Sequence, residues 1–210
     1  MSPESRSIQA DRPLIMKRFP NGIDDKWFYQ HRSPDPMPDA PFSRVIEVAR
    51  WLHDKLDALG TACVAKTSGA SGIHIFIPLP AGTPYDAGML FCQILQILAT
   101  IVASRHPKAA TVERMVKKRP TDVVYIDYLQ NIYGKTLASA YSARASPFAG
   151  VSTPLTREEV HDGLKSGLAP PDFTMRNIFD RLAAVGDLWS ALRTGPTADL
   201  RTVLQYAEPE

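Results

Sequence analysis

The stretch Lys66-Thr67-Ser68-Gly69-Ala70-Ser71-Gly72-Ile73-His74, residues 66–74, joins two short runs that are typical of β-strands, Ala62 to Lys66 and Ile73 to Leu79. The glycines and serines in the middle are turn-forming residues, and a few of them between two strands favour a hairpin. A hairpin makes its two strands antiparallel neighbours. The stretch therefore predicts the start of an antiparallel sheet.

Helical patterns lie on both sides of this hairpin. Apolar residues recur at helical spacing from Phe42 to Leu59, and Gly60 ends that helix. A second helix is expected from about Tyr85 to His106, and a strand from Val123 to Tyr128 with Leu137 to Tyr141 as its candidate neighbour. Strands and helices mix without a strict βαβ rhythm. This order predicts an α+β fold with a mainly antiparallel sheet flanked by helices.

The two ends of the chain differ from its middle. Residues 1–12 are expected to be disordered, residues 13–195 to form a single domain, and residues 196–210 to form a C-terminal tail. Four prolines within residues 33–41 argue against regular structure there, because proline has no N–H group. Thr156 to Glu159 carry the capping-box pattern, which predicts the start of a short helix.

The composition is typical of a globular protein. The chain has 210 residues, of which 44% are hydrophobic and 22% charged, and its formal net charge is +2. This balance argues against global disorder and does not by itself indicate a nucleic-acid binder. Cys63 and Cys92 form no C-x-x-C pair and are expected to be buried free thiols in a reducing cytosol. The sequence shows neither a signal-peptide pattern nor a membrane-spanning run, so a cytoplasmic protein without a membrane partner is expected.

The 66–74 stretch also has the chemistry of an anion site. Small residues let the backbone approach a ligand closely, and successive N–H groups can form a concave anion site. The side chains of Lys66, Ser68 and His74 would add hydrogen-bond donors for a phosphate. A plain hairpin loop is an equally good interpretation of these residues alone, because no Walker A or G-x-G-x-x-G pattern is present.

Asp127 is the strongest metal-ligand candidate. It lies in the apolar strand Val123 to Tyr128, where a carboxylate is costly to bury unless it is paired or binds a metal ion. Hard divalent ions such as Mg²⁺ and Mn²⁺ prefer oxygen ligands of this kind. A capping or salt-bridged carboxylate is the alternative interpretation.

Cations lie on both sides of Asp127 along the chain. Lys135 and Arg144 follow it, and an arginine can hold a triphosphate with two N–H groups. Residues 114–119 contain four cations in six positions, which suits contact with a nucleic-acid backbone. These four are Arg114, Lys117, Lys118 and Arg119. Taken singly, each cation is more often a solvated surface charge.

The other histidines carry no such signal. His31, His53, His106 and His161 show no metal-ligand spacing relative to one another and are interpreted as surface or core residues.

Several motifs occur in a fixed order. They are R-P-L-x-x-K-R-x-P-N-G-I-D, K-T-S-G-x-x-G-x-H, D-Y-x-x-N, Y-S-x-R and V-S-x-P-L. They stand at Arg12 to Asp24, Lys66 to His74, Asp127 to Asn131, Tyr141 to Arg144 and Val151 to Leu155. Together they resemble the polymerase domain of the bacterial ligase D family, a member of the archaeo-eukaryotic primase superfamily. The resemblance runs from about residue 12 to residue 190, and several motifs in order are far more specific than any one of them.

The resemblance implies a primase-polymerase-like fold and a bacterial nucleotidyltransferase that adds nucleotides, often ribonucleotides, to DNA ends in non-homologous end joining. It implies Mn²⁺ or Mg²⁺ as cofactor, with Asp127 and Asp35 as catalytic metal ligands. DNA ends and nucleoside triphosphates are implied partners, as are Ku and a separately encoded DNA ligase. The implied nucleotide-binding residues are Lys66, Ser68, His74, Lys135 and Arg144. The implied DNA-binding residues are Lys17, Arg18, Arg114, Lys117, Lys118 and Arg119.

The chain departs from the family before its first long helix. The family has a longer segment there, including a strand that ends in D-x-D-P, whereas this chain passes almost directly from Gln30-His31 to Asp35-Pro36. This indicates an internal deletion near residues 31–36, with loss of a central segment. Ser33 stands where the first acid of D-x-D-P is expected. We therefore expect impaired activity unless another acid such as Asp39 substitutes. The alternative is a catalytically inactive remnant that binds DNA ends or nucleotides.

Overall fold

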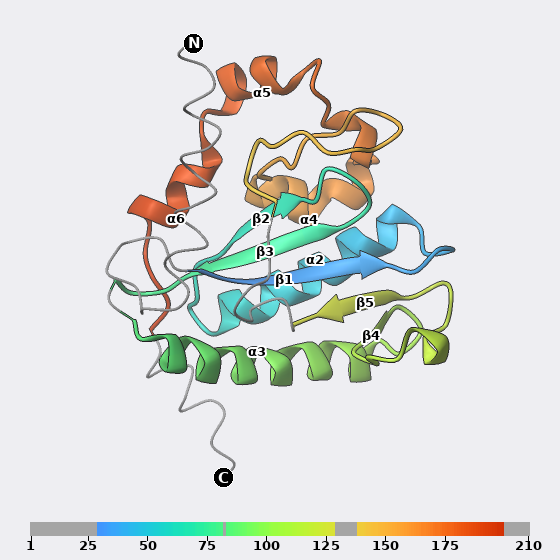
Figure 1. The fold of residues 1–210 in the computed structure, drawn as a ribbon, viewed down its shortest axis with the longest axis vertical. Coiled ribbons are helices and arrows are strands. Elements are labelled where there is room, and N and C mark those ends of the chain that lie inside the picture. Colours follow the sequence, from blue (N-terminus) through green and yellow to red (C-terminus); the bar gives the residue numbers. More distant parts are fainter. Residues whose placement is uncertain (1–28, 82, 129–137, 200–210) are drawn as a thin grey trace, which may run out of the picture.

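The computed structural model describes residues 29–81, 83–128 and 138–199. Its strands form one five-stranded sheet in the order β2-β3-β1-β5-β4 (Figure 1). The pairings β2–β3, β3–β1 and β1–β5 are antiparallel, whereas β4 pairs with β5 in parallel. The fold is therefore α+β, as expected, but its sheet is mixed. The strands are β1 (Tyr29–Pro36), β2 (Val64–Thr67), β3 (Ile73–Pro78), β4 (Ala110–Thr111) and β5 (Val124–Asp127).

Strand β1 is the central strand and runs through the proline-rich segment. The prediction that these prolines exclude regular structure is wrong. The N–H of Met37 donates to the carbonyl of Val123, and the register pairs Pro34 with Ile126 and Pro36 with Val124. Hydrogen-bonded and non-hydrogen-bonded positions alternate along an antiparallel pair. Both prolines therefore fall where the backbone nitrogen faces away from β5, and no ladder hydrogen bond is lost.

Each half of β1 pairs with a different strand. Residues 29–32 pair with β3, and residues 33–36 pair with β5. The single strand thus connects the hairpin to the rest of the sheet at the segment where a deletion was inferred. The deletion itself stays a prediction, because the described strands form a continuous order without it.

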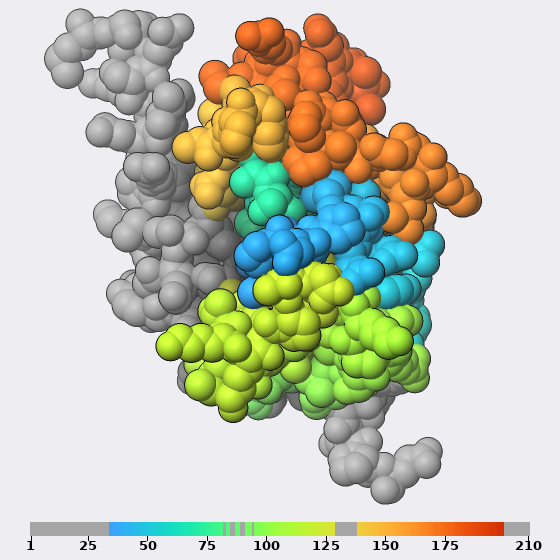
Figure 2. Space-filling model, turned by 90° about the vertical axis from the view of Figure 1, so that its right-hand side faces the viewer, coloured from blue at the N-terminus to red at the C-terminus, as the bar shows by residue number. Residues whose placement is uncertain are grey.

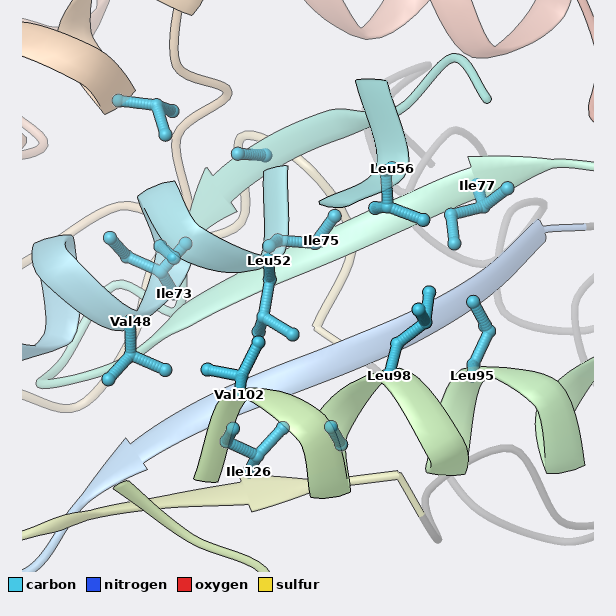
Figure 3. Packing of buried hydrophobic residues seen from close by; sticks show 14 of the residues in the cluster. Val48, Leu52, Leu56, Ile73, Ile75, Ile77, Leu95, Leu98, Val102 and Ile126 are labelled. Carbon is cyan, nitrogen blue, oxygen red and sulfur yellow. The ribbon is translucent and has the colours of Figure 1, made fainter. Parts of the chain in front are cut away.

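Two long helices pack against one face of the sheet. Helix α2 (Phe42–Ala58) lies behind the strands and α3 (Tyr85–Arg105) runs along the β4–β5 side (Figure 1). Both match their predicted ranges, and Gly60 with φ +61° follows the end of α2 as expected. Figure 3 shows side chains of α2, α3, β3 and β5 meeting in one core. They include Val48, Leu52, Ile75, Leu98, Val102 and Ile126, all at most 2% exposed.

This core fixes the register of the strands. Burying a side chain such as Leu or Ile stabilises a protein by about 1.5–3 kcal/mol. A slip of one residue would turn every inward side chain of a strand to the opposite face. Because Ile126 and Ile75 are fully buried against the helices, their neighbours in sequence are held on the other face.

The C-terminal part packs on both sides of the sheet. Helix α4 (Arg157–Ser166) lies beside α2 on the helical side, whereas Trp189 packs on Phe76 on the other face. Helix α4 begins at Thr156 with the predicted capping box and is followed by α5 (Ile178–Val185) and α6 (Ala191–Thr194). Before α4, isolated bridges join Lys66 to Pro154 and Ala143 to Val151. Residues 138–141 form no strand, so within the described residues the expected neighbour of β5 is absent. Its place is taken by β1, which has the longer set of antiparallel partners.

In Figure 2 the blue segment at the end of β1 reaches the surface between the yellow-green residues around β5 and the orange C-terminal part. Among the described helices, none has the length and apolar character needed to cross a membrane.

Candidate functional site

Two carboxylates lie on the sheet face that the long helices leave uncovered. Residue 33 pairs with Asp127, and Asp35 pairs with Tyr125. Residues directly opposite each other point to the same face, and so do alternate residues along a strand. Asp35, Tyr125 and Asp127 therefore share one face, opposite to the buried Ile126. Asp127 is only 7% exposed.

The glycine-rich loop packs directly against Asp35. A Cβ atom at Gly72 would lie 2.9 Å from Oδ1 of Asp35 and 2.8 Å from the carbonyl oxygen of Pro34. Both separations are shorter than real Cβ contacts allow. Only glycine permits this approach, and the loop thereby reaches the acidic part of β1.

The other side of the loop touches Arg144. Gly69 has φ +78°, and a Cβ atom there would overlap Cγ of Arg144 and come within 2.9 Å of the backbone nitrogen of Ser152. The N–H of Arg144 donates to the carbonyl of Gly150 at 2.8 Å, which fixes the backbone beside the loop. The exposed Arg144 side chain thus lies at the loop, and its contact with phosphate stays a prediction.

Ser68 closes the loop on itself. Its Oγ accepts hydrogen bonds from the N–H groups of Ala70 at 3.1 Å and Gly72 at 3.0 Å, and its own N–H donates to the carbonyl of Gly72. These two N–H groups therefore point to Ser68 rather than outward. The loop is held rigid by its serine, and the expected concave site cannot use them in this conformation.

Lys66 is fully buried between the hairpin and the C-terminal part. Its Nζ donates to Oγ of Ser152 and lies 3.3 Å from Nδ1 of His74, its partner across the two strands. Ser152 in turn donates to the carbonyl of Thr67 at 2.9 Å. Burial, followed by repulsion from Arg144, lowers the pKa of Lys66 to about 7. At neutral pH this amine is close to losing its proton.

An aromatic group continues the same face across β3. The ring of Phe76 lies 6.2 Å from that of His74 and 4.8 Å from that of Trp189, and Nζ of Lys66 lies 5.3 Å from its centroid. Trp189 follows α5 in the chain, so the C-terminal part covers this end of the face. The face thus changes from acidic at β1 and β5 to basic and aromatic at β2 and β3.

The basic turn 114–119 borders β5. The guanidinium of Arg119 lies 3.5 Å from the ring centroid of Tyr125 and donates to the carbonyls of Glu113 and Arg114. Arg119 therefore holds the turn in place. Arg114, Lys117 and Lys118 are exposed. The candidate residues Lys17, Arg18 and Lys135 lie outside the described residues.

The arrangement contains residues that the sequence patterns did not single out. Ser152 accepts the hydrogen bond from Lys66. It is the serine of the V-S-x-P-L motif, for which the sequence patterns indicated no role. Nδ1 of His53 lies 3.3 Å from Nε2 of His161, although the sequence positions of the two residues suggested no relation. Only the packing of one helix on another brings them together.

Residues 34–189 match the family described as LigD, primase-polymerase domain. The chain belongs to this family. It is 33% identical over 153 residues to the bifunctional non-homologous end joining protein LigD of Bacillus subtilis, a match that covers 72% of this chain and 24% of the relative. It is 35% identical over 127 residues to the multifunctional LigD of Pseudomonas aeruginosa, covering 60% of this chain and 14% of that protein.

A solved structure agrees with this assignment. The fold matches the polymerase domain of Mycobacterium tuberculosis ligase D, determined in complex with DNA, with a TM-score of 0.65 and 25% sequence identity. The match covers 79% of this chain and 54% of that one. The chain therefore spans about a quarter or less of the LigD proteins it matches, and about half of the solved domain chain.

The donor set on the acidic face suits the metals of this family. Asp35 and Asp127 offer carboxylate oxygens, the ligands that Mg²⁺ and Mn²⁺ prefer. The side chains come from neighbouring strands and the same face, as diagonal neighbours two pair positions apart. Two acids fit a hard divalent ion with remaining positions for water or phosphate oxygens.

Proposed function

We propose that this chain is a nucleotidyltransferase domain that adds nucleotides, ribonucleotides among them, to DNA ends during non-homologous end joining, with activity reduced by the serine at position 33. The observation that carries the proposal is the strand register. It supports a site in which Asp35 and Asp127 share a face with the loop that ends at Gly72 and with the Lys66–His74 pair. Family membership supplies the reaction class.

The metal ions would be held by Asp35 and Asp127. Bound Mn²⁺ or Mg²⁺ would neutralise charge on the triphosphate and favour ionisation of the primer 3′-hydroxyl. Strands β3 and β5 lie on either side of β1, so their axes are about 10 Å apart. That spacing suits a triphosphate extending from the acids toward the basic end of the face.

The nucleotide would be bound by the basic end. Arg144 is exposed beside the loop and can hold phosphate oxygens with two N–H groups. His74 and Lys66 lie behind the loop. Ser68 is also assigned to the nucleotide, because its Oγ sets the conformation of the loop. Lys135 is assigned to the same group by its motif position.

DNA would approach along the basic turn. Arg114, Lys117 and Lys118 present exposed cations next to β5, and phosphate contacts of this kind supply sequence-independent affinity. Arg119 would position the turn rather than bind DNA, because its guanidinium already stacks on Tyr125. Lys17 and Arg18 are assigned to DNA by motif position, and Ku and a DNA ligase are proposed partners in the repair reaction.

The reduced activity follows from position 33. Residue 33 pairs directly with Asp127, and it is a serine. A third carboxylate would complete the charge around a two-metal site. Loss of one group that stabilises developing charge typically lowers a rate by about 10²–10³-fold.

The decisive experiment adds the acid back. Ser33→Asp is expected to raise Mn²⁺-dependent primer extension by about 100-fold, and Ser33→Asn, which has a similar size without the charge, is the matched control. Asp127→Ala should abolish extension both in the unchanged protein and when combined with Ser33→Asp. Equal rates for Ser33→Asp, Ser33→Asn and the unchanged protein would contradict the role given to position 33.

A second function is favoured by one observation. The basic elements are retained while position 33 has no acid, which suits a domain that binds DNA ends or nucleotides without catalysis. Absence of extension even with Ser33→Asp, together with retained binding to a DNA hairpin in an electrophoretic assay, would support this alternative.

A further inference from the structure

Two histidines and an aspartate converge between α2 and α4. His53 and Asp57 lie one turn apart on α2, and His161 lies on α4, which packs beside α2 behind the sheet (Figure 1). Nδ1 of His53 lies 3.3 Å from Nε2 of His161 and 3.3 Å from Oδ2 of Asp57. All three potential ligand atoms lie within 4.8 Å of one another.

These separations match the ligand spacing around a zinc ion. Four ligands at about 2.0–2.1 Å in a tetrahedron lie about 3.3–3.4 Å from each other. Two of the three edges of the cluster already have that length. Two imidazoles and one carboxylate, with a fourth position for water, are a common zinc ligand set.

The surroundings orient the ligands. Nδ1 of His161 lies 3.6 Å from Oδ1 of Asp54, so its other nitrogen is directed at the cluster. The side chain of His53 is only 8% exposed, so the packing around α2 holds its ring in place.

One cation competes for the same carboxylate. Arg157 contacts both oxygens of Asp57 and lowers the pKa of that carboxyl group. Its side chain is 57% exposed and can turn into water without breaking the core. An incoming ion would therefore replace a solvent-exposed arginine in a surface ion pair, a kind of contact that contributes little to stability.

We propose that His53, Asp57 and His161 form a zinc site that clamps α4 to α2, separate from the carboxylates of β1 and β5. The ligand chemistry distinguishes the two sites, because imidazole nitrogen suits Zn²⁺ whereas carboxylate oxygens suit Mg²⁺ and Mn²⁺. The zinc ion would join two helices and take no part in nucleotide transfer, since α2 packs on the face of the sheet opposite to Asp127.

The test measures binding directly and does not depend on polymerase activity. The full chain is stripped with chelator, dialysed against Zn²⁺ and analysed for bound metal, and Co²⁺ is added separately to record the intense visible absorption of four-coordinate cobalt. We expect stoichiometric zinc, the cobalt spectrum and a raised melting temperature. His161→Gln, which changes a half-buried ligand, should lose all three while keeping the metal-free melting temperature.

Three further variants test whether zinc binds at this cluster and nowhere else on the chain. Asp127→Ala and His106→Gln should keep zinc, since neither lies in the cluster. Arg157→Gln should bind zinc more tightly because the competing cation is gone. Absence of stoichiometric zinc in both the unchanged chain and Arg157→Gln would overturn the proposal. Zinc binding that is equal in His161→Gln and the unchanged chain would overturn it as well.

Discussion

Two groups of ionisable side chains lie on opposite sides of the central sheet, and the chain assembles them in different ways. Asp35 and Asp127 are brought together by strand register, within motifs that can be recognised in the sequence. His53 and His161 are 108 positions apart and meet because two helices pack against each other. Strand pairing preserves a local sequence signal, whereas helix packing leaves none at the residues involved.

The two groups also differ in what surrounds them. The acidic face borders exposed arginine and lysine side chains and a loop whose glycine lets it pack against Asp35. The histidine cluster has a buried member and an arginine already paired with its aspartate. The first arrangement is suited to a large anionic substrate, and the second to a small cation.

The largest effect is expected from a mutation in the acidic group that leaves the histidine cluster unchanged. Asp127→Ala should lower Mn²⁺-dependent extension by at least about 100-fold, because the metal ion that would stabilise the developing negative charge loses a ligand. The same variant should bind Zn²⁺ as the unchanged chain does. Primer extension and metal analysis on one preparation check both expectations, and coupled loss of both would show that the two groups are not independent.

The next effect concerns the buried amine of Lys66. Its pKa falls to about 7 in the folded protein from an ordinary value of 10.5. Between these two values the unfolded chain holds the proton and the folded chain does not, so stability should rise as pH increases through this window. Below about pH 7 both states are protonated and the full cost of burying the charge is present.

Lys66→Met should remove this dependence while filling similar space. Urea unfolding between pH 6.5 and 9 would show a smaller rise in the free energy of unfolding for Lys66→Met than for the unchanged chain. Lys165→Met, at a side chain that is 85% exposed, is the matched control and should keep the rise. An identical rise in the unchanged chain and Lys66→Met would contradict the assignment.

A smaller effect is expected at the contact between loop and acid. Gly72→Ala places a methyl group against Asp35 and the carbonyl of Pro34, and overpacking of this kind costs about 1–3 kcal/mol. Ser71→Ala in the same loop is exposed and should change the free energy of unfolding little. Urea unfolding of both variants measures the difference, and equal stability would mean that the loop yields freely.

The smallest effect is expected at the start of α4. Thr156 accepts from the N–H of Glu159, and the Glu159 carboxylate accepts from the N–H of Thr156. Thr156→Ala should cost about 1 kcal/mol and weaken zinc binding slightly, because α4 carries His161. Thr156→Ser should keep both properties. Zinc binding that is insensitive to the loss of the cap would show that the cluster does not depend on this helix end.

Position 33 shows how sequence and structure divide the information about the site. The motif pattern predicts that Ser33 replaces an acid, and the register places residue 33 directly opposite Asp127. The number of prolines beside it led to the wrong prediction of an irregular segment. Their spacing is what matters, because Pro34 and Pro36 occupy alternate positions of the strand. Alternate prolines leave every ladder position on the β5 side intact.

The loop shows the opposite case. Its glycines and serine can be recognised in the sequence, but the direction of its N–H groups cannot. Ser68 accepts from Ala70 and Gly72, so two donors expected to face a ligand are used within the loop. Side-chain hydroxyls compete with ligands for backbone donors, and only the conformation of the turn decides which partner is chosen.

The sequence by itself determined the family, the two long helices, the hairpin around residues 66–74 and the candidate acids, because each depends on patterns that are local in the chain. The tertiary structure decided the central place of β1, the parallel pairing of β4, the burial of Lys66 and the meeting of His53 with His161. These features depend on contacts between distant segments. Such contacts are set by how whole faces pack, and no short pattern encodes that.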